Sequence, residues 1–185
     1  MRIIAGEWRR RRLSVPDGIR PMLDRERERL FAILGERIEG ARVLDLFSGT
    51  GAIGLEALSR GAAFCASVEN GRKVLPVLRA NLALVEPGDR HRLIETSVFH
   101  LTALDPFDVV IAAPPFPLLH DEAWRARFQD LFGRILEEWL EPGGIFVLEM
   151  PAELDPEQLT NLGPPADTRK TAASRLAFWS RPVSG

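Results

Sequence analysis

Three glycines and one glutamate have the spacing with the clearest chemical meaning in this sequence. Gly49, Gly51 and Gly54 fit the pattern G-x-G-x-x-G, and Glu69 lies 20 residues after the first of them. Glycine lets the backbone bend sharply and approach a ligand, and the N–H groups at the start of a following helix face an anionic or polar group. A carboxylate at this distance accepts two hydrogen bonds from a ribose diol. The stretch therefore predicts a site for a nucleoside-bearing cofactor.

The glycine pattern alone does not separate NAD from S-adenosylmethionine. Asp45, four residues before Gly49, favours S-adenosylmethionine, because an acid beside the loop can receive a cationic ammonium group directly or through water. The structural alternative is a tight turn followed by a surface glutamate. Titration with both cofactors distinguishes the two ligand classes.

A second stretch, Ala113-Pro114-Pro115-Phe116, follows the apolar run of residues 107–112. Ligands bind at the carboxyl ends of strands in open α/β sheets, so this stretch is placed where a substrate would lie. Phe116 follows the paired prolines at this strand end and is therefore a candidate for contact with a ligand.

Alternating strands and helices are needed to position both stretches. Apolar runs predict strands over residues 42–47, 64–69, 91–97, 107–113 and 145–150, and extended segments at about 166–173 and 175–180. Helical spacing predicts helices over residues 22–38, 52–61, 72–84, 156–161 and a further one that carries Trp124, Phe128 and Trp139 as core residues. This order predicts an α/β protein with a doubly wound, mostly parallel sheet covered on both faces.

Positive charge is concentrated at the N-terminus. Residues 1–29 hold nine arginines and five acids, a net charge of +4. Because the whole chain has a net charge of −2, the remaining residues carry −6. Residues 1–20 are expected to form a basic β-like segment ending in a turn at Pro16-Asp17-Gly18. A basic end on an acidic body indicates a polyanionic partner such as nucleic acid, although a solvated arm is the simpler alternative. Trp8 within it is suited either to stacking or to core packing.

Composition limits the remaining classes. The 185 residues are 45% hydrophobic and 27% charged, which is typical of one globular domain. No apolar run approaches the ~20 residues that span a bilayer, and the start lacks the apolar segment of a signal peptide. The single cysteine, Cys65, excludes an internal disulfide framework, and His91, His100 and His120 share no metal-ligand spacing. We therefore expect a soluble, cytoplasmic protein without a metal.

The chain resembles the RsmD-type bacterial methyltransferases over most of its length. The resemblance is carried by the segments MRIIAGEWRRRRL, IRPMLDRERERLF, VLDLFSGTGAIGLEALSRGA, the pair VE that ends at Glu69, and RKTAASRLAFWSR. This family uses S-adenosylmethionine to methylate a guanine N2 amine of small-subunit (16S) ribosomal RNA. The resemblance implies a class I methyltransferase fold with seven strands, the last antiparallel, and a small N-terminal β-hairpin. It implies a basic hairpin over residues 1–20 and a Rossmann-like methyltransferase domain over residues 21–185.

The resemblance also implies roles for individual residues. Those implied to bind the cofactor are Asp45, Phe47, Gly49, Gly51, Gly54, Glu69, Asn70 and Thr96. Those implied to hold the reacting base are Ala113, Pro114, Pro115 and Phe116. Those implied to bind RNA phosphates are Arg9, Arg10, Arg11, Arg12 and Arg20. The implied partner is small-subunit ribosomal RNA or an assembling small subunit, bound by a monomer without a membrane or a metal.

Three stretches, with four residues in all, depart from the family's pattern. Ala113 stands where the family has Asp or Asn, Thr96 stands where it has Asp or Asn, and Met22 and Leu23 replace two threonines. An exocyclic amine is a poor nucleophile, so a polar side chain and a backbone carbonyl hold its N–H bonds and aim its nitrogen. Ala113 retains the carbonyl framework but removes the side-chain acceptor.

Three hypotheses follow from these residues. The first is an active RNA methyltransferase, favoured by the whole-chain resemblance and the retained Pro-Pro-Phe. The second is a non-catalytic or weakly active RNA-binding relative, favoured by Ala113 and Thr96. The third is a nicotinamide-binding domain, favoured by the glycine pattern alone.

Overall fold

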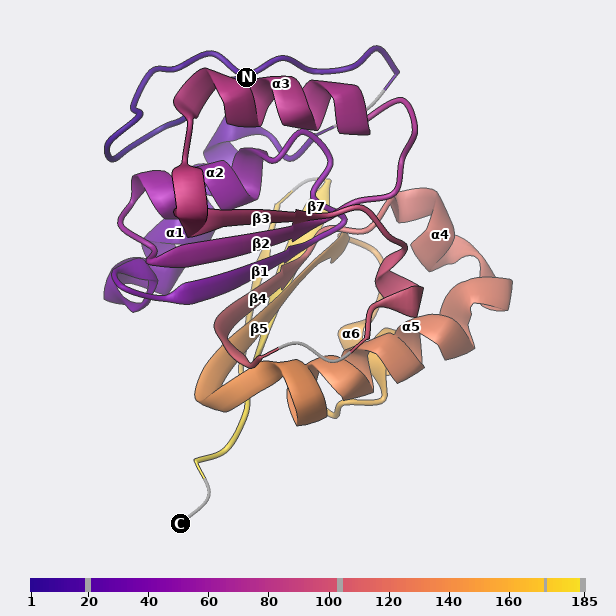
Figure 1. Ribbon diagram of the computed structural model, residues 1–185. Helices are drawn as coiled ribbons and strands as arrows, with labels where there is room; N and C mark the ends of the chain where they lie inside the picture. The colour runs from indigo at the N-terminus through magenta and orange to yellow at the C-terminus, as the bar shows by residue number, and fades with distance from the viewer. Residues whose placement is uncertain (19–20, 103–104, 172, 184–185) are drawn as a thin grey trace. The chain divides into compact units, whose positions relative to one another are not determined.

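The computed structural model describes residues 1–18, 21–102, 105–171 and 173–183. They contain a seven-stranded sheet with the strand order β3-β2-β1-β4-β5-β7-β6 (Figure 1). The chain divides into two compact units, Met1–Ser97 and Val98–Gly185. Each unit is described separately below.

The strands and helices have the following bounds. The strands are β1 (Arg42–Leu46), β2 (Phe64–Val68), β3 (His91–Ile94), β4 (Phe107–Ala112), β5 (Leu140–Pro151), β6 (Asp167–Lys170) and β7 (Ser174–Ser180). The α-helices are α1 (Asp24–Leu34), α2 (Ala52–Ser59), α3 (Leu75–Val85), α4 (Phe116–His120), α5 (Glu122–Arg134) and α6 (Pro156–Thr160). Short 3-10 turns lie at Gly35–Ile38, Gly88–Arg90 and Val98–His100, and a π-helical turn at Ile135–Trp139.

The first unit is built on three parallel strands. β1 pairs with β2, and β2 pairs with β3, in parallel register. Four of the five residues of β1 and of β2 are buried, as expected of strands covered on both faces. Helix α2 packs against both strands and is buried at all eight of its residues. A helix buried all round needs a cover on its outer side, and the N-terminal segment supplies part of it.

The second unit combines parallel and antiparallel pairing. β4 and β5 are parallel, whereas β7 runs antiparallel to both β5 and β6. This confirms the antiparallel last strand. A row of aromatic rings runs from the half-buried Trp124 and Phe99 into the core of this unit, with successive centroids 5.3–5.5 Å apart. Such pairs contribute about 0.5–1.5 kcal/mol each beyond the apolar area that they bury. The row comprises Trp124, Phe99, Phe128, Phe132, Phe146 and Trp179.

Most of the predicted elements are confirmed, and the differences lie at their ends. The helix predicted over residues 22–38 is α1 followed by a 3-10 turn. The helix around Trp124 ends in a π-helical turn at Trp139, which is fully buried. Pro76 occupies the first turn of α3, where its missing N–H group costs no helical hydrogen bond.

The two sides of the N-terminal segment are joined by an isolated antiparallel bridge between Arg2 and Arg12 and by backbone hydrogen bonds from Ile3 to Arg11 (2.9 Å) and from Leu13 to Met1 (3.1 Å). Between them, Ile4 and Ala5 donate their N–H groups to the side chain of Glu56 in α2. The expected β-hairpin stays a prediction. The division into residues 1–20 and 21–185 stays a prediction. Every helix within the described ranges is too short or too polar to cross a membrane.

Candidate functional site

The glycine turn joins the end of β1 to the start of α2. Gly51 has a φ of 78° and is the N-cap residue of α2. The left-handed φ favours glycine, and a Cβ atom on Gly51 would lie 2.4 Å from Leu78 Cδ1 of α3, so any other residue would be strained and would displace the Leu78 side chain. The Gly51 N–H donates to the Ser48 carbonyl (2.8 Å), which closes the turn.

Gly54 lets α2 approach the strands beneath it. A Cβ atom here would lie 2.8 Å from Cys65 Sγ and 3.0 Å from Ser67 Oγ, both on β2. The Gly54 N–H donates to Asp45 Oδ2 over 3.0 Å. The third glycine of the pattern therefore serves the packing of helix on strand, and it brings the helix start onto Asp45.

Asp45 is fully buried at the end of β1. Burial raises the pKa of its carboxyl from 3.8 to about 7; the hydrogen bond from Gly54 opposes this shift and the charge of Glu69 adds to it. Its Oδ1 atom has no hydrogen-bond partner among the described residues. A buried acceptor without a partner is costly, and a donor such as an ammonium group, reached directly or through water, would satisfy it. This atom fits the cofactor expected from the sequence.

Glu69 ties the end of β2 to the glycine turn. Its Oε2 accepts from the Gly49 N–H (2.8 Å), and its Oε1 accepts from the N–H groups of Asn70 (2.9 Å) and Gly71 (2.7 Å). A carboxylate offers about four acceptor positions, so three are occupied by the backbone. A ribose diol at this carboxylate must therefore share or displace at least one backbone donor.

Two other predicted cofactor residues, Phe47 and Thr96, follow the strands β1 and β3 of the same unit. Phe47 has a left-handed φ of 59°, a conformation that non-glycine residues rarely adopt and that is concentrated at functional sites. Thr96 follows β3, and its N–H donates to the Ile94 carbonyl (3.0 Å). Its neighbour Glu95 accepts a hydrogen bond from Arg79 Nε of α3 (3.0 Å). Glu95 is therefore engaged in an ion pair, whereas Thr96 and Ser97 are the uncharged polar residues at this strand end.

The proline stretch lies in the second unit, directly after β4. Ala113 and Phe116 are half-buried, Pro114 is buried and Pro115 is exposed. Pro115 precedes the first residue of α4, and its carbonyl accepts from the Leu118 N–H (3.0 Å). The stretch therefore has the predicted position at the carboxyl end of a buried strand.

Arginines of the N-terminal segment surround two hollows. One hollow of about 520 Å³ is lined by Met1, Arg2, Arg10, Arg12, Leu13 and Asp24. A second of about 300 Å³ is lined by Arg2, Ile3, Ile4, Arg9, Arg10, Asp24 and Glu28. The larger hollow is lined by three arginines and one carboxylate, Asp24, whose Oδ2 lies 3.8 Å from Arg2 Nε, and this excess of positive charge suits an anion such as a phosphodiester. Arg20 lies outside the described residues.

Several residues considered for chemistry are structural. Trp8 is 7% exposed, with Arg90 5.0 Å from its ring centroid, so it packs in the core. Burial raises the pKa of the Cys65 thiol, which disfavours its thiolate form. The described residues contain no group of three or more His, Cys, Asp or Glu residues placed to hold a metal.

Comparison with known proteins agrees with this geometry. A family model described as conserved hypothetical protein 95 matches residues 1–180. The ribosomal RNA small subunit methyltransferase D of Escherichia coli is 42% identical over 139 residues, which cover 68% of this chain and 70% of that protein. The chain belongs to this methyltransferase family. The sequence-based assignment to the RsmD-type family is thereby confirmed.

Solved structures extend the similarity within the family to the whole chain. A putative methyltransferase from E. coli has a TM-score of 0.81 and 31% identity, and covers 100% of this chain and 99% of that one. A 16S rRNA N2 methyltransferase from Thermus thermophilus, solved with S-adenosylmethionine and guanosine, has a TM-score of 0.66 and 26% identity. That match covers 83% of this chain and 41% of the other. The seven-stranded, mostly parallel sheet is that of methyltransferases.

Proposed function

We propose that this protein transfers a methyl group from S-adenosylmethionine to the N2 amine of a guanine in small-subunit ribosomal RNA. The observation that carries the proposal is that two carboxylates accept hydrogen bonds from the backbone of the glycine turn. Glu69 accepts from Gly49 at the first glycine, and Asp45 accepts from Gly54 at the third. Membership of the methyltransferase family favours S-adenosylmethionine over NAD as the cofactor of this turn.

The cofactor residues have distinct tasks in this proposal. Glu69 accepts hydrogen bonds from the ribose diol, and the buried Asp45 Oδ1 receives the donor of the amino-acid part. Gly51 keeps the turn free of side chains. Phe47, Asn70 and Thr96 complete the proposed set. When bound, S-adenosylmethionine supplies an electrophilic methyl group on a positively charged sulfur.

The protein's task on the substrate side is to position the guanine amine. Phe116 offers a stacking face, and the rigid Pro114-Pro115 pair fixes the backbone carbonyl that accepts from an N–H bond of the amine. As the nitrogen–carbon bond forms, the carbon–sulfur bond breaks and the amine releases a proton to solvent. Ala113 contributes no side-chain acceptor to this positioning.

The RNA partner is proposed to bind through the arginines of the N-terminal segment. Arg10 and Arg12 line the larger hollow together with Arg2, and Arg9 lines the smaller one with Arg2 and Arg10. Phosphate contacts of this kind position RNA without reading its sequence. A protein that modifies ribosomal RNA is expected in the cytoplasm, where ribosomes assemble, and a monomer stays our prediction.

Transfer of labelled methyl groups tests the proposal. Purified protein is incubated with labelled S-adenosylmethionine and either deproteinised small-subunit RNA or partly assembled small subunits, and the RNA is digested to nucleosides. We expect label in N2-methylguanosine. A Gly51→Leu variant, whose side chain would collide with Leu78, provides the inactive control. Absence of transfer by a protein that binds the cofactor would contradict the proposal.

One observation favours a second candidate, a non-catalytic or weakly active RNA-binding relative. Ala113 follows β4 at the position where the family's pattern has an acceptor side chain. In that case Ala113→Asp would convert an inactive protein into an active one. Equal turnover by the unsubstituted protein and the variant would exclude this candidate.

A further inference from the structure

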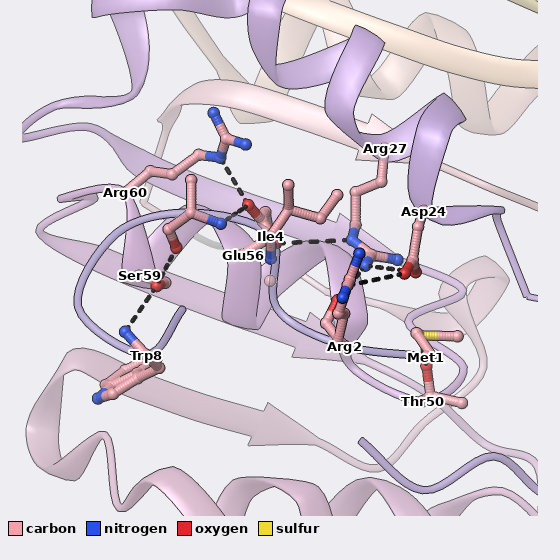
Figure 2. Close-up of polar contacts among 12 residues, drawn as sticks. Met1, Arg2, Ile4, Trp8, Asp24, Arg27, Thr50, Glu56, Ser59 and Arg60 are labelled. Atoms are coloured by element: carbon pink, nitrogen blue, oxygen red, sulfur yellow. Dashed lines mark hydrogen bonds and ion pairs between the residues drawn. The ribbon is translucent and has the colours of Figure 1, made fainter. Parts of the chain in front are cut away.

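The N-terminal arm, defined as residues 1–14, is bonded to helix α2 through a fully buried carboxylate. Glu56 is 0% exposed. Its Oε2 accepts from the Ile4 N–H (2.7 Å) and its Oε1 from the Ala5 N–H (3.1 Å), as Figure 2 shows for Ile4. Glu56 Oε1 also accepts from Nε of Arg60, the residue after α2 (2.7 Å), and Glu56 Oε2 lies 3.7 Å from Nε of the buried Arg27 of α1, so the carboxylate is paired with two arginines (Figure 2). Charge-assisted hydrogen bonds to backbone N–H groups are among the stronger ones in proteins.

The same helix holds the next turn of the arm through Ser59. Its hydroxyl accepts from the Trp8 N–H (3.0 Å) and donates to the Ala5 carbonyl (2.6 Å), and its own carbonyl accepts from the Glu7 N–H (2.7 Å). A Cβ atom on Gly6 would lie 1.6 Å from the Ser59 carbonyl oxygen. The arm therefore lies directly on the backbone of α2, at a distance that only glycine permits.

A second anchor joins the end of the arm to the glycine turn. Asn81 of α3 is 1% exposed. Its Oδ1 accepts from the Ser14 N–H (2.8 Å), and its Nδ2 donates to the Ser14 carbonyl (3.0 Å) and to the Thr50 carbonyl (2.9 Å). One buried side chain thus bonds both to the arm and to the residue between the first two glycines of the turn.

The start of the arm reaches the same residue. The Met1 sulfur lies 3.7 Å from Thr50 Oγ1, and Met1 is joined to the other end of the arm because its carbonyl accepts from the Leu13 N–H (3.1 Å). Figure 2 shows Met1 beside Thr50. The start of the arm therefore contacts Thr50 directly and its end contacts Thr50 through Asn81, and Thr50 belongs to the glycine turn proposed to hold the cofactor.

The larger arginine hollow lies between the docked arm and helix α1. Its lining combines Arg2, Arg10 and Arg12 of the arm with Asp24 of α1, whose Oδ2 lies 3.8 Å from Arg2 Nε. RNA that binds in this hollow stabilises the docked arm over a released one. The docked arm in turn holds Asn81 and Thr50 in place.

We propose that Asn81 is a positioning residue that couples the N-terminal arm to the glycine turn, so that RNA bound by the arm tightens cofactor binding. This inference rests on the proposed function. Because coupling between two binding sites is reciprocal, the cofactor tightens RNA binding by the same factor. The protein thereby favours the ternary complex, in which methyl transfer takes place, over cofactor bound without its substrate.

Binding measurements without turnover test the coupling. The affinity for S-adenosylhomocysteine is measured by calorimetry with and without saturating deproteinised small-subunit RNA. We expect RNA to tighten the wild-type affinity about 5- to 10-fold, within the usual range for coupled sites. In Asn81→Ala this ratio is expected to fall below about 2, because the bond that links Ser14 to Thr50 is absent.

Two further variants separate coupling from a general loss of structure. Ser14→Pro removes the arm's N–H donor to Asn81 from an exposed position and is expected to lower the ratio as Asn81→Ala does. Ser59→Ala removes the bonds to Trp8 and Ala5 at the other end of α2 but keeps the connection to Thr50. It weakens docking and is expected to keep the ratio at or above the wild-type value.

The outcomes are distinct. Independent binding in the wild type, or an unchanged ratio in both Asn81→Ala and Ser14→Pro, overturns the coupling and leaves the proposed function standing. Equal loss of the ratio in Ser59→Ala also overturns it, because any loosening of the arm would then suffice. Failure of the wild-type protein to bind S-adenosylhomocysteine overturns the proposed cofactor, and the inference with it.

Discussion

At the scale of single residues, Ala113 is the position where the sequence departs most clearly from what the proposed reaction requires, because alanine has no side-chain acceptor. It follows a buried strand and directly precedes a rigid proline pair, yet its side chain has no acceptor for an N–H group of an amine. Its neighbours Pro114 and Phe116 keep the backbone and the stacking face. We therefore expect this position to affect the rate of methyl transfer rather than the kind of reaction.

We predict that Ala113→Asp accelerates methyl transfer by about 10²–10³, the usual effect of a single hydrogen bond aimed at a transition state. The measurement is the single-turnover rate with saturating RNA and S-adenosylmethionine. Ala113→Leu, which adds bulk without an acceptor, is the matched control and should give no acceleration. Comparable rates for the Asp variant and the unsubstituted protein would show that another residue holds the amine.

Asp45 predicts a pH dependence of stability. Its folded pKa of about 7 lies above the ordinary 3.8, so the folded protein binds this proton more tightly than the unfolded chain does. The stability from this proton is complete below 3.8 and is lost as pH rises to about 7. Relative to the wild type, Asp45→Asn should therefore gain stability between pH 5 and pH 7.5.

Urea unfolding of the wild type and Asp45→Asn at the two pH values measures this difference. The comparison must be between variants because His91, whose pKa burial lowers to about 4, has the opposite effect: its stability is lost as pH falls below 6.5. A pH dependence that is the same in both proteins would contradict a protonated Asp45.

At the scale of elements, the N-terminal arm shows what sequence patterns miss. Strands and helices were predicted at their observed places because apolar periodicity is a local property of the chain. The contacts that hold the arm could not be predicted, because the acceptors for its N–H groups, Glu56 and Ser59, lie more than 50 residues away in the chain. A charged residue in the otherwise apolar run of α2 was the one available sign.

The candidate site follows the same division. The glycine turn with Asp45 and Glu69 could be predicted, since a short motif specifies its own backbone. Asn81 could not, because an asparagine in a helix has no pattern that marks its contacts with Ser14 and Thr50. Long-range polar anchors of this kind are visible only in the folded protein.

Two neighbouring arginines of the arm, Arg11 and Arg12, are expected to contribute unequally to RNA binding. Arg12 lines the larger hollow and Arg11 does not, although both are exposed and carry the same charge. Arg12→Ala should weaken RNA binding and lower the slope of log affinity against log salt by about 0.7, the value for one phosphate contact on single-stranded RNA. Arg11→Ala is the charge-matched control, measured by fluorescence anisotropy over a potassium chloride series. Equal losses would indicate a diffuse charge effect rather than a built phosphate site.

At the scale of the whole molecule, the N-terminal arm and the glycine turn differ in charge and in the ligand that we propose for each. The first 29 residues carry +4 and the remainder −6, so a polyanion is drawn to the arm. The arm is bonded at Thr50 to the turn proposed to hold the cofactor. The central claim is therefore that this turn binds S-adenosylmethionine.

Calorimetric titration of the wild-type protein with S-adenosylmethionine and, separately, with NAD tests that claim most directly. We predict one S-adenosylmethionine site per chain, weakened in Glu69→Ala, and no heat of binding for NAD. Tight binding of NAD without binding of S-adenosylmethionine would contradict the account.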